Sequence, residues 1–263
     1  MLNVQIPELK KINGSLRTVS TPYGYAVSEG DIEGHSTKRI TGFRAAMSNG
    51  TYDDISGITA VKIPIPASAI TLEVVGNAAD AAAGAGAHKI EVYGLGAQFE
   101  EQSESVIMAG AGAVALVKSY IRVNRMNVTA AGSNKIATGP IILQATGGGT
   151  EYMQISASTN VSGQCHFTVP ANHVAYLVGW SAGSTGSKPT RLDLVVAMDP
   201  ASGKVLDGIY GNVDTIVADS AFSYKPLPIP IRCPPKCDIK IRGLATGAGA
   251  SCSGAIELWI EKE

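Results

Sequence analysis

Charged residues are scarce in this chain of 263 residues. They make up 16% of the sequence, against about 25% in an ordinary soluble protein. The formal net charge is -1 and the isoelectric point lies near 6.4, so no excess of Lys and Arg creates an electropositive field for a phosphate backbone. We therefore expect no direct contact with nucleic acid. A surface so poor in charge also favours extensive coverage by neighbouring subunits.

Long apolar runs are absent as well. No stretch reaches the roughly 18 consecutive apolar residues of a membrane span; the best candidate, 106–117, is rich in Gly and Ala and ends at Lys118. The N-terminal sequence MLNVQIPELKK lacks the apolar core of a signal peptide. We expect that the protein does not associate with a membrane and that it is made and assembled in a cytoplasm.

Only four cysteines occur, at positions 165, 233, 237 and 252. Cys233 and Cys237, with Cys252 and the Cys165-His166 pair, can be drawn as a zinc site, but structural zinc usually has two close ligand pairs such as C-x2-C. A disulfide between Cys252 and Cys233 or Cys237 is a second alternative. A cytoplasmic origin favours the third, buried free thiols.

Catalytic constellations are missing. The four histidines have no H-x-x-x-H spacing, and the segment Ser181–Gly186 resembles a nucleophile elbow without a following helix, so we expect a loop there. The carboxylates of Asp53, Asp54, Glu100, Glu101 and Glu104 are expected at solvated hairpin ends. The sequence predicts no catalytic, cofactor-binding or metal-ligating residues, and hence no enzyme.

Glycine and proline are plentiful, and they separate short stretches rich in Val, Ile and Tyr. This punctuation is typical of an all-β protein. Residues 61–65 and 238–242 alternate with one apolar face, as in a strand with one face on a core. Three continuous apolar runs, 140–143, 175–180 and 191–198, predict central strands. The Ala-rich segment 78–87 is expected to be a loop because Gly84 and Gly86 oppose a helix.

The segment 120–128 alternates, but its apolar set slips by one position between Val123 and Met126. A β-bulge near Asn124-Arg125 would restore a single apolar face. The same bulge would bring Arg122 and Arg125 to one side of the strand.

Three consecutive glycines, 147–149, suggest a boundary because they suit a hinge or an exposed loop. We expect two antiparallel β-sandwich or jelly-roll domains, residues 40–146 and 150–263. Residues 1–39 alternate poorly, and they are expected to form either an extended N-terminal arm that docks on a neighbouring subunit or an irregular edge of the first domain.

Several segments, in order along the chain, resemble virion structural proteins of tailed bacteriophages. The first matches an N-D-x-A-A-G-T-G-A-R-like run leading into a V-x-V-x-G-L-like strand. Its matching residues are Asn77, Asp80, Ala82, Ala83, Gly84, Gly86, Ala87, Val92, Gly94 and Leu95. The later matching segments are 119–126, 130–134, 138–141, 169–177, 228–231 and 238–242. Asn172-His173 and the Cys-Pro-Pro-Lys-Cys segment depart from the pattern.

The resemblance implies a nonenzymatic part of a phage particle, assembled in the cytoplasm of a bacterial host. The expected role is a head decoration or cement protein, a homo-oligomer and most simply a trimer, that binds the major capsid protein or other virion proteins. A tail or neck component, such as an adaptor, nozzle or fibre-associated ring protein, is the alternative. A carbohydrate-binding receptor module is a third hypothesis, with Trp180, Tyr176 and Tyr210 as stacking residues.

Overall fold

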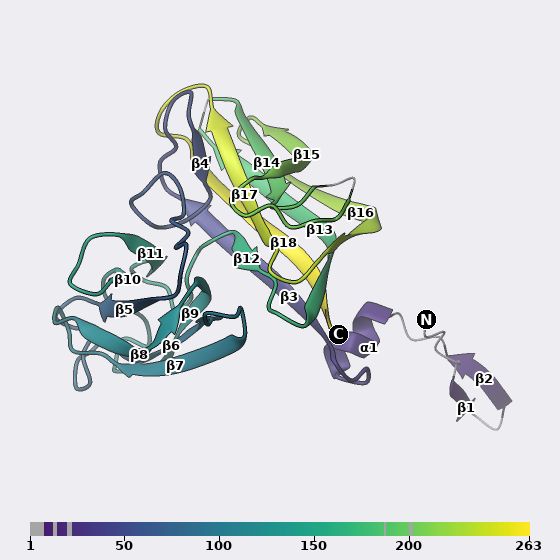
Figure 1. Ribbon diagram of the computed structural model, residues 1–263, viewed down its shortest axis with the longest axis horizontal. Helices are drawn as coiled ribbons and strands as arrows, with labels where there is room; N and C mark the ends of the chain where they lie inside the picture. Colours follow the sequence, from purple (N-terminus) through teal and green to yellow (C-terminus); the bar gives the residue numbers. More distant parts are fainter. Residues whose placement is uncertain (1–7, 13–14, 20–22, 187, 200–201) are drawn as a thin grey trace.

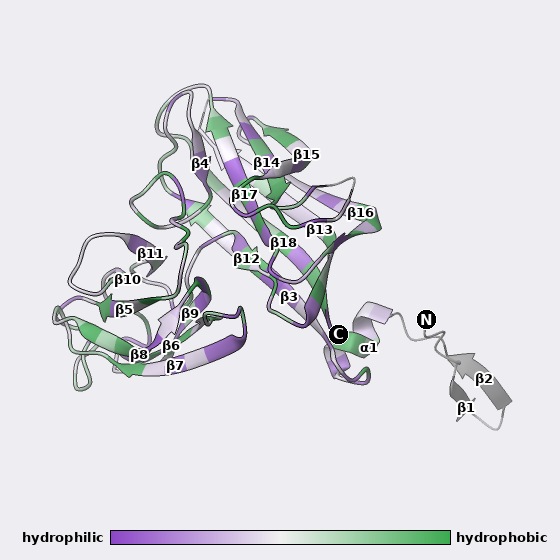
Figure 2. Ribbon diagram, in the orientation of Figure 1, coloured by the Kyte–Doolittle hydropathy of each residue, from purple (hydrophilic) through white to green (hydrophobic). Residues whose placement is uncertain are grey.

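The computed structural model describes residues 8–12, 15–19, 23–186, 188–199 and 202–263. In these residues, eighteen strands and one short helix occur, and every pairing between the strands is antiparallel. Hydrophobic and hydrophilic residues are interspersed along the strands (Figure 2), as expected where one face of a strand lies on a core. The prediction of an all-β protein made of antiparallel sandwiches is confirmed.

The first sandwich is built from seven strands that follow one another in the chain. These are β5 (Ile70–Val75), β6 (Ala87–Leu95), β7 (Glu101–Ile107), β8 (Val114–Tyr120), β9 (Arg122–Ala131), β10 (Ile141–Ala145) and β11 (Glu151–Ile155). They form a four-stranded sheet of order β11-β10-β5-β8 and a three-stranded sheet of order β7-β6-β9. Between the sheets lies a core that includes Val74, Ile90, Val92 and Leu143, all fully buried.

The second sandwich collects strands from both ends of the chain (Figure 1). These are β3 (His35–Arg44), β4 (Tyr52–Asp54), β12 (His166–Thr168), β13 (His173–Thr185), β14 (Thr190–Val196), β15 (Gly211–Ala218), β16 (Phe222–Cys233), β17 (Asp238–Ala245) and β18 (Ser251–Lys262). One sheet has the order β12-β17-β14-β15, with β4 also paired to β17, and the other β16-β13-β18-β3. As predicted, the three continuous apolar runs lie in central strands, β10, β13 and β14.

The boundaries between the two units differ from the expected ones. β3 and β4 pair with β18 and β17, so residues 35–54 belong to the second sandwich. Gly147–Gly149 form the turn of the β10–β11 hairpin and not a linker between units. Across this turn, Ala145 N donates to Thr150 O at 3.0 Å. All three glycines have positive φ, 88°, 87° and 109°. Consecutive glycines suit a tight turn as well as a hinge, so the sequence alone does not distinguish a hairpin turn from a boundary between domains.

The predicted β-bulge is confirmed. Tyr93 pairs with Arg125 and Gly94 with Val123, so Asn124 is the additional residue in β9. Val123 and Met126 thereby both point into the first core. Arg122 and Arg125 are not brought together, because Arg122 is buried and Arg125 is exposed.

Two segments with alternating sequences behave differently from expectation. Residues 61–65 form no strand, and Ile63 instead donates its backbone N–H to Asp54 at 2.8 Å. β17 is covered on both faces, because Asp238 and Lys240 are buried beside opposite charges. Period-two alternation shows which side chains share a face, but a polar face also becomes buried when counter-charges arrive from elsewhere.

The N-terminal region contains a hairpin, β1 (Glu8–Ile12) with β2 (Ser15–Val19), and the helix α1 (Tyr23–Glu29). β1 and β2 lie apart from both sandwiches (Figure 1). α1 packs on the second sandwich, with the ring of Tyr23 4.7 Å from that of Trp259. An arm or irregular edge was expected over residues 1–39, but β3 already begins at His35. Residues 1–7, 13–14 and 20–22 of this segment lie outside the described residues. In the described residues, no helix is long and apolar enough to cross a membrane.

Candidate functional site

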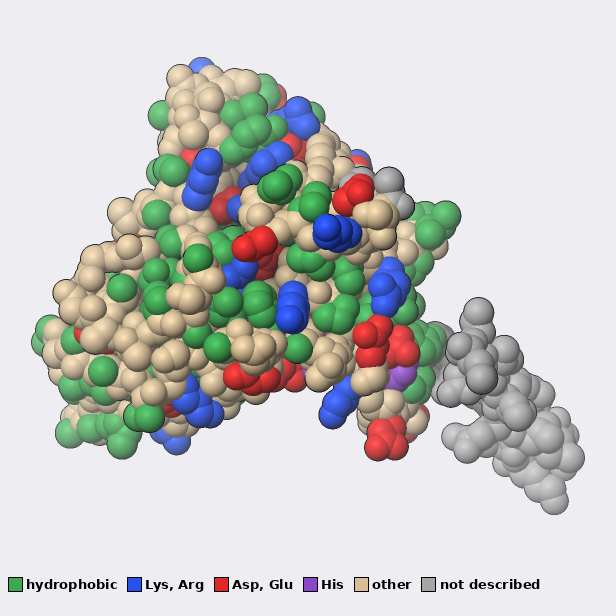
Figure 3. Space-filling view, viewed as in Figure 1, with side chains coloured by type: hydrophobic (Ala, Val, Ile, Leu, Met, Phe, Trp, Pro, Cys, Tyr) green, Lys and Arg blue, Asp and Glu red, His purple; other side chains and the backbone are tan. Residues whose placement is uncertain are grey.

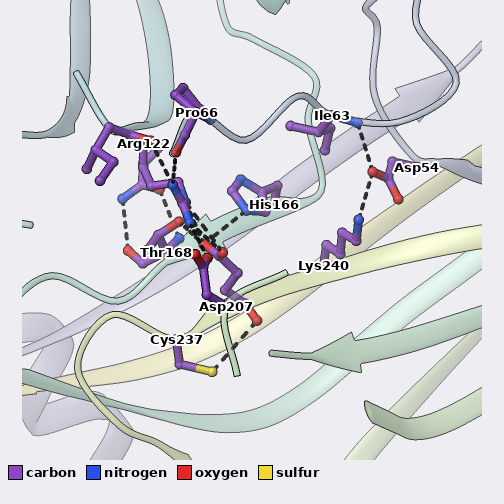
Figure 4. A network of polar contacts seen from close by, with 12 residues as sticks. Asp54, Ile63, Pro66, Arg122, His166, Thr168, Asp207, Cys237 and Lys240 are labelled. Carbon is purple, nitrogen blue, oxygen red and sulfur yellow. Dashed lines mark hydrogen bonds and ion pairs between the residues drawn. The ribbon is translucent and has the colours of Figure 1, made fainter. Parts of the chain in front are cut away.

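The two sandwiches meet at a buried ion pair (Figure 4). Arg122, at the start of β9, is 5% exposed, and Asp238, at the start of β17, is 1% exposed. Arg122 Nε lies 3.1 Å from Asp238 Oδ1, and Nη2 lies 3.1 Å from Oδ2, so the guanidinium binds the carboxylate through two nitrogens. This geometry is the strong bidentate arrangement of arginine and carboxylate.

The remaining polar atoms of this pair also have partners. Arg122 Nη1 donates to the carbonyl oxygens of Pro66 and Ile121, at 3.2 and 2.9 Å. The Thr168 hydroxyl donates to Asp238 Oδ1, and His166 Nε2 lies 3.4 Å from the same oxygen. Two charges in a poorly hydrated place are stable only with such complete satisfaction.

The ionisation of Asp238 follows from these contacts. Burial alone disfavours a charged carboxylate, but the neighbouring His166 and then Arg122 hold the pKa of Asp238 well below its usual range. Asp238 is therefore charged at neutral pH, as the ion pair with Arg122 requires.

The bulge residue Asn124 makes a second link across the junction. Its side-chain Nδ2 donates to Thr168 O at 3.0 Å, and Thr168 N donates to Asn124 Oδ1 at 2.9 Å. A bulge changes the direction of a side chain relative to the regular strand, which here allows an amide from the first sandwich to pair with a strand of the second.

A third link comes from the turn between β6 and β7. Ala171 N donates to Phe99 O at 2.8 Å. Two cations lie near the Phe99 ring, with Arg122 and Lys236 each 5.4 Å from its centroid. The junction therefore combines ionic, amide and cation–π contacts.

The neighbouring carboxylates Asp53 and Asp54 were expected in solvent, and this expectation is wrong. Both are buried: Asp53 pairs with Arg44 at 2.9 Å, and Asp54 pairs with Lys240 at 2.9 Å. Lys240 also lies 4.1 Å from the centroid of the Tyr210 ring. The partner of Asp53 is nine positions away on the neighbouring segment, whereas 186 positions separate Asp54 from Lys240, and no local pattern reveals the second pairing.

A second structural centre holds the loop 77–87 of the first sandwich, which is a loop as predicted. Asp80, fully buried, accepts hydrogen bonds from the backbone N–H groups of Ala87, Thr138 and Gly139 at 2.8, 2.9 and 3.1 Å, and from the Thr138 hydroxyl at 2.9 Å. Burial disfavours its charge, but these hydrogen bonds from Thr138, Ala87 and Gly139 lower the pKa of Asp80. One carboxylate therefore joins two loops.

The glycines of this loop are required by space. A Cβ on Gly86 would lie 2.2 Å from Asp80 Oδ1 and 2.3 Å from Thr138 Oγ1. A Cβ on Gly139 would lie 2.2 Å from Asn77 Nδ2. The glycines thus allow the two loops to approach the buried carboxylate closely.

These two centres contain residues from most of the segments that resemble phage virion proteins. The segment beginning at Asn77 meets the segment 138–141 around Asp80, and the segment 119–126 meets the segment 238–242 at the ion pair. Every one of these contacts holds strands or loops together. Sequence reasoning found Arg122 and Asp238 but not their pairing, because 116 positions separate them.

The cysteines are free and buried, so the interpretation as buried thiols is confirmed. Burial raises the pKa of Cys165 and, for Cys252, raises it to about 11. Among the described residues, no three His, Cys, Asp or Glu side chains are grouped so as to hold a metal ion. The thiols are therefore part of the second core.

Of the three proposed sugar-stacking residues, Trp180 is enclosed and the two tyrosines are only partly accessible. Trp180 is fully buried and donates its Nε1–H to Asp214 at 2.9 Å. Tyr176 and Tyr210 are half-buried, and the Tyr210 ring contacts Lys240. The segment 181–186, expected as a loop, lies largely in β13, and Ser181 is buried. A ring enclosed by its own core cannot stack on a sugar.

A groove of about 590 Å³ lies beside the junction. One wall is β3, and the opposite wall comes from β6, β7 and β9 of the first sandwich. Its lining includes Thr37, Arg39, Tyr93, Glu101, Arg125 and Phe167. Both walls are provided by the same chain, so the groove exists because the two sandwiches are held together.

Large hydrophobic side chains also reach the surface (Figure 3). The most exposed are Val117 at 89%, Ile229 at 82% and Val217 at 70%. Single exposed apolar residues are ordinary, but Val217, Phe222, Tyr224 and Ile229 all lie on β15 and β16, the edge strands of the two sheets of the second sandwich. This edge offers apolar area for contact.

No protein-family model matches the chain, and no curated protein matches it. Among solved structures, the PBSX exported protein XepA is similar with a TM-score of 0.19 and 10% identity, over 98% of this chain and 100% of that chain. Particles of T=1 symmetry derived from infectious bursal virus are similar with a TM-score of 0.21 and 10% identity, over 88% and 74%. Likeness at this level carries no information on activity or partners.

Proposed function

We propose that the chain is a nonenzymatic structural component of a virus particle of the tailed-phage kind. The observation that carries this proposal is that the segments resembling virion proteins make contacts within the chain itself. Their polar residues hold the loops around Asp80 and the junction between the sandwiches, and are consumed by internal contacts. The residues that carry the resemblance therefore maintain a shape, which is what a building block requires.

Within the particle, we propose a decoration or cement role on the head, as a homo-oligomer and most simply a trimer, in contact with the major capsid protein or another virion protein. The low charge and the apolar edge formed by β15 and β16 support a role in contact formation. An interface of standard size, about 1,600 Å² of which about 57% is apolar, gains roughly 23 kcal/mol of gross apolar burial before association costs. Repetition over a symmetric shell multiplies this gain. The role requires no contact with nucleic acid or membrane.

The same architecture suits a tail or neck component, and the order of the oligomer separates the two positions. Three copies favour the local threefold axes of a head, whereas six or twelve copies favour a ring in the tail or neck. Light scattering of the purified full-length chain gives this number directly.

The decisive experiment is the copy number and position of this chain in purified particles, from quantitative mass spectrometry and a reconstructed density map. We expect many symmetric copies on the head. Copies confined to the tail would support the alternative position. Absence of the chain from mature particles would overturn the proposal. So would an enzymatic activity that copurifies with the chain and is lost when the chain is denatured.

A further inference from the structure

Strand β3 has a free edge. It pairs with β18 on one side only. Lys262 N, on the β18 side, donates to Gly34 O, while Phe43 N donates away from β18 to Gly163 O. Because backbone groups alternate in direction along an antiparallel strand, the N–H and C=O groups of Thr37, Arg39 and Thr41 point away from β18.

Two of these positions face the groove beside the junction. Thr37 and Arg39 line it, whereas Thr41 does not. In the described part of the chain, no hydrogen bond is formed by the backbone N–H of Thr37 or Arg39. The groove therefore presents unpaired strand backbone, which is the template for an added strand.

The size of the groove limits what can enter. A strand in a sheet occupies about 160 Å³ per residue, from a spacing of about 4.8 Å between strands, about 10 Å between sheets and about 3.3 Å per residue. A volume of about 590 Å³ thus holds roughly four residues of a single strand. The opposite wall, with Tyr93 and Arg125, limits the groove to a narrow occupant of this size.

The other edge of the same sheet is protected. β16 carries prolines at positions 226, 228 and 230, and proline has no N–H to donate to a further strand. β3 contains no proline. Of the two edges of this sheet, β3 is therefore the one open to pairing.

The sequence offers an occupant. Leu2-Asn3-Val4-Gln5-Ile6 alternates apolar and polar residues, carries no side-chain charge, and is followed by Pro7, which suits the end of a short strand. The groove is lined by Lys38, Arg39 and Arg125 against a single acid, Glu101. It therefore disfavours a basic segment such as Lys10-Lys11 and accepts an uncharged one.

The position of the hairpin directs this segment toward another copy. β1 and β2 pair only with each other and lie apart from both sandwiches (Figure 1). An isolated two-stranded ribbon is marginally stable in water, so it gains by docking. We propose that residues 2–6 of one copy add to β3 of a second copy as a fifth strand of the β16-β13-β18-β3 sheet. Of the proposed function, this inference uses only the homo-oligomer.

Disulfide trapping tests the proposal on the full-length chain. Chains carrying Asn3→Cys or Gln5→Cys are co-expressed with a differently tagged chain carrying Thr37→Cys, and are then oxidised. The native thiols are buried and do not compete. We expect a cross-linked species with both tags, since a disulfide requires Cβ atoms within about 4.5 Å. Thr150→Cys, at the exposed turn of the β10–β11 hairpin, replaces Thr37→Cys as the matched control.

Two results would overturn the proposal. One is cross-linking no greater than in the Thr150→Cys control for both arm positions. The other is a disulfide formed only within one chain when both substitutions are combined, because the arm would then dock on its own copy.

A proline pair gives an independent readout. Thr37→Pro removes an outward N–H inside the groove, and Thr41→Pro removes one outside it, while neither position donates an N–H to β18. We expect about tenfold weaker self-association for Thr37→Pro alone, since a lost hydrogen bond of about 1.4 kcal/mol is tenfold. Equal association of both folded variants with the parent contradicts the proposal. If the chain is found in particles but the cross-link between copies does not form, only the docking of residues 2–6 is refuted. If the cross-link forms but the chain is absent from particles, only the proposed function is refuted.

Discussion

At the scale of single residues, the molecule depends on buried charges that are paired with opposite charges. Arg122 is the main cation facing Asp238, and its N–H groups are distributed over the carboxylates of Asp238 and Asp207 and the carbonyl oxygens of Pro66 and Ile121. A buried ion pair is weak evidence of net stability, but removing one member leaves the other charge buried without compensation.

Arg122→Met is therefore expected to lower the free energy of unfolding by about 3–5 kcal/mol. Urea titration followed by fluorescence measures this change. Arg125→Met, three positions away and exposed, is the control and should change stability by no more than about 0.5 kcal/mol.

The double variant Arg122→Met with Asp238→Leu refines the test. Because both charges are then absent, the combined loss should be smaller than the sum of the two single losses. Equal losses for Arg122→Met and Arg125→Met would show that the ion pair does not hold the junction.

At the scale of elements, two local devices shape the first sandwich. The loop 77–87 is held by Asp80 and requires glycine where backbone and carboxylate meet. The bulge at Asn124 keeps one face of β9 apolar and also provides the amide that pairs with Thr168. Both devices are short in sequence, and each has consequences for a distant segment.

Gly86→Ala should destabilise the protein by about 1–3 kcal/mol, because its Cβ has no room beside Asp80 and Thr138. Thermal melting monitors the effect. Gly57→Ala is the matched control, since its Cβ would meet nothing closer than 3.4 Å. Similar melting temperatures for the two variants would mean that the loop relaxes at little cost.

Val123→Asp tests the direction of β9 around the bulge. Val123 is 8% exposed and faces the first core, so we expect a loss of about 3 kcal/mol or more and little soluble protein. Thr129→Asp, on an exposed position of the same strand, should melt like the parent. An unchanged Val123→Asp protein would show that the inward and outward faces of β9 are misassigned.

At the scale of the whole molecule, the chain forms the second sandwich from both of its ends and inserts the first sandwich between them. Two connections therefore cross the junction, and the ion pair, the Asn124–Thr168 amide pair and the Phe99 contacts join the same surfaces. The groove and the apolar edge are thus carried by two units that are joined by several polar contacts.

Acid should weaken this arrangement in a defined window. The pKa values of Asp238 and Asp80 are lowered in the folded protein, and an unfolded Asp titrates near pH 3.9. The unfolded chain thus binds protons first as the pH falls, so the stability from these groups is complete above about pH 5 and decreases below about pH 4.

Urea midpoints from pH 7 to pH 3 test this sign. The parent should lose stability mainly below about pH 4, and Asp80→Asn should show a smaller decrease over the same range because one of the depressed groups is gone. An identical pH dependence in the two proteins would refute a charged Asp80 in the folded state.

The sequence by itself determined the class of the fold, the central strands, the loop at 78–87 and the bulge in β9. Each of these depends on neighbouring residues, through period-two alternation, turn-forming glycines and the slip between Val123 and Met126. Local steric and hydrophobic patterns are present in the sequence and need no distant partner.

Only the tertiary structure decided where the units begin, that β3 and β4 belong with the C-terminal strands, and that Asp53, Asp54 and Asp238 are buried. It also decided that Gly147–Gly149 form a turn and that Trp180 is enclosed. The physical reason is the same in each case: strand pairing and charge compensation join residues far apart in the chain, and a single sequence carries no signal of which distant partner each residue meets.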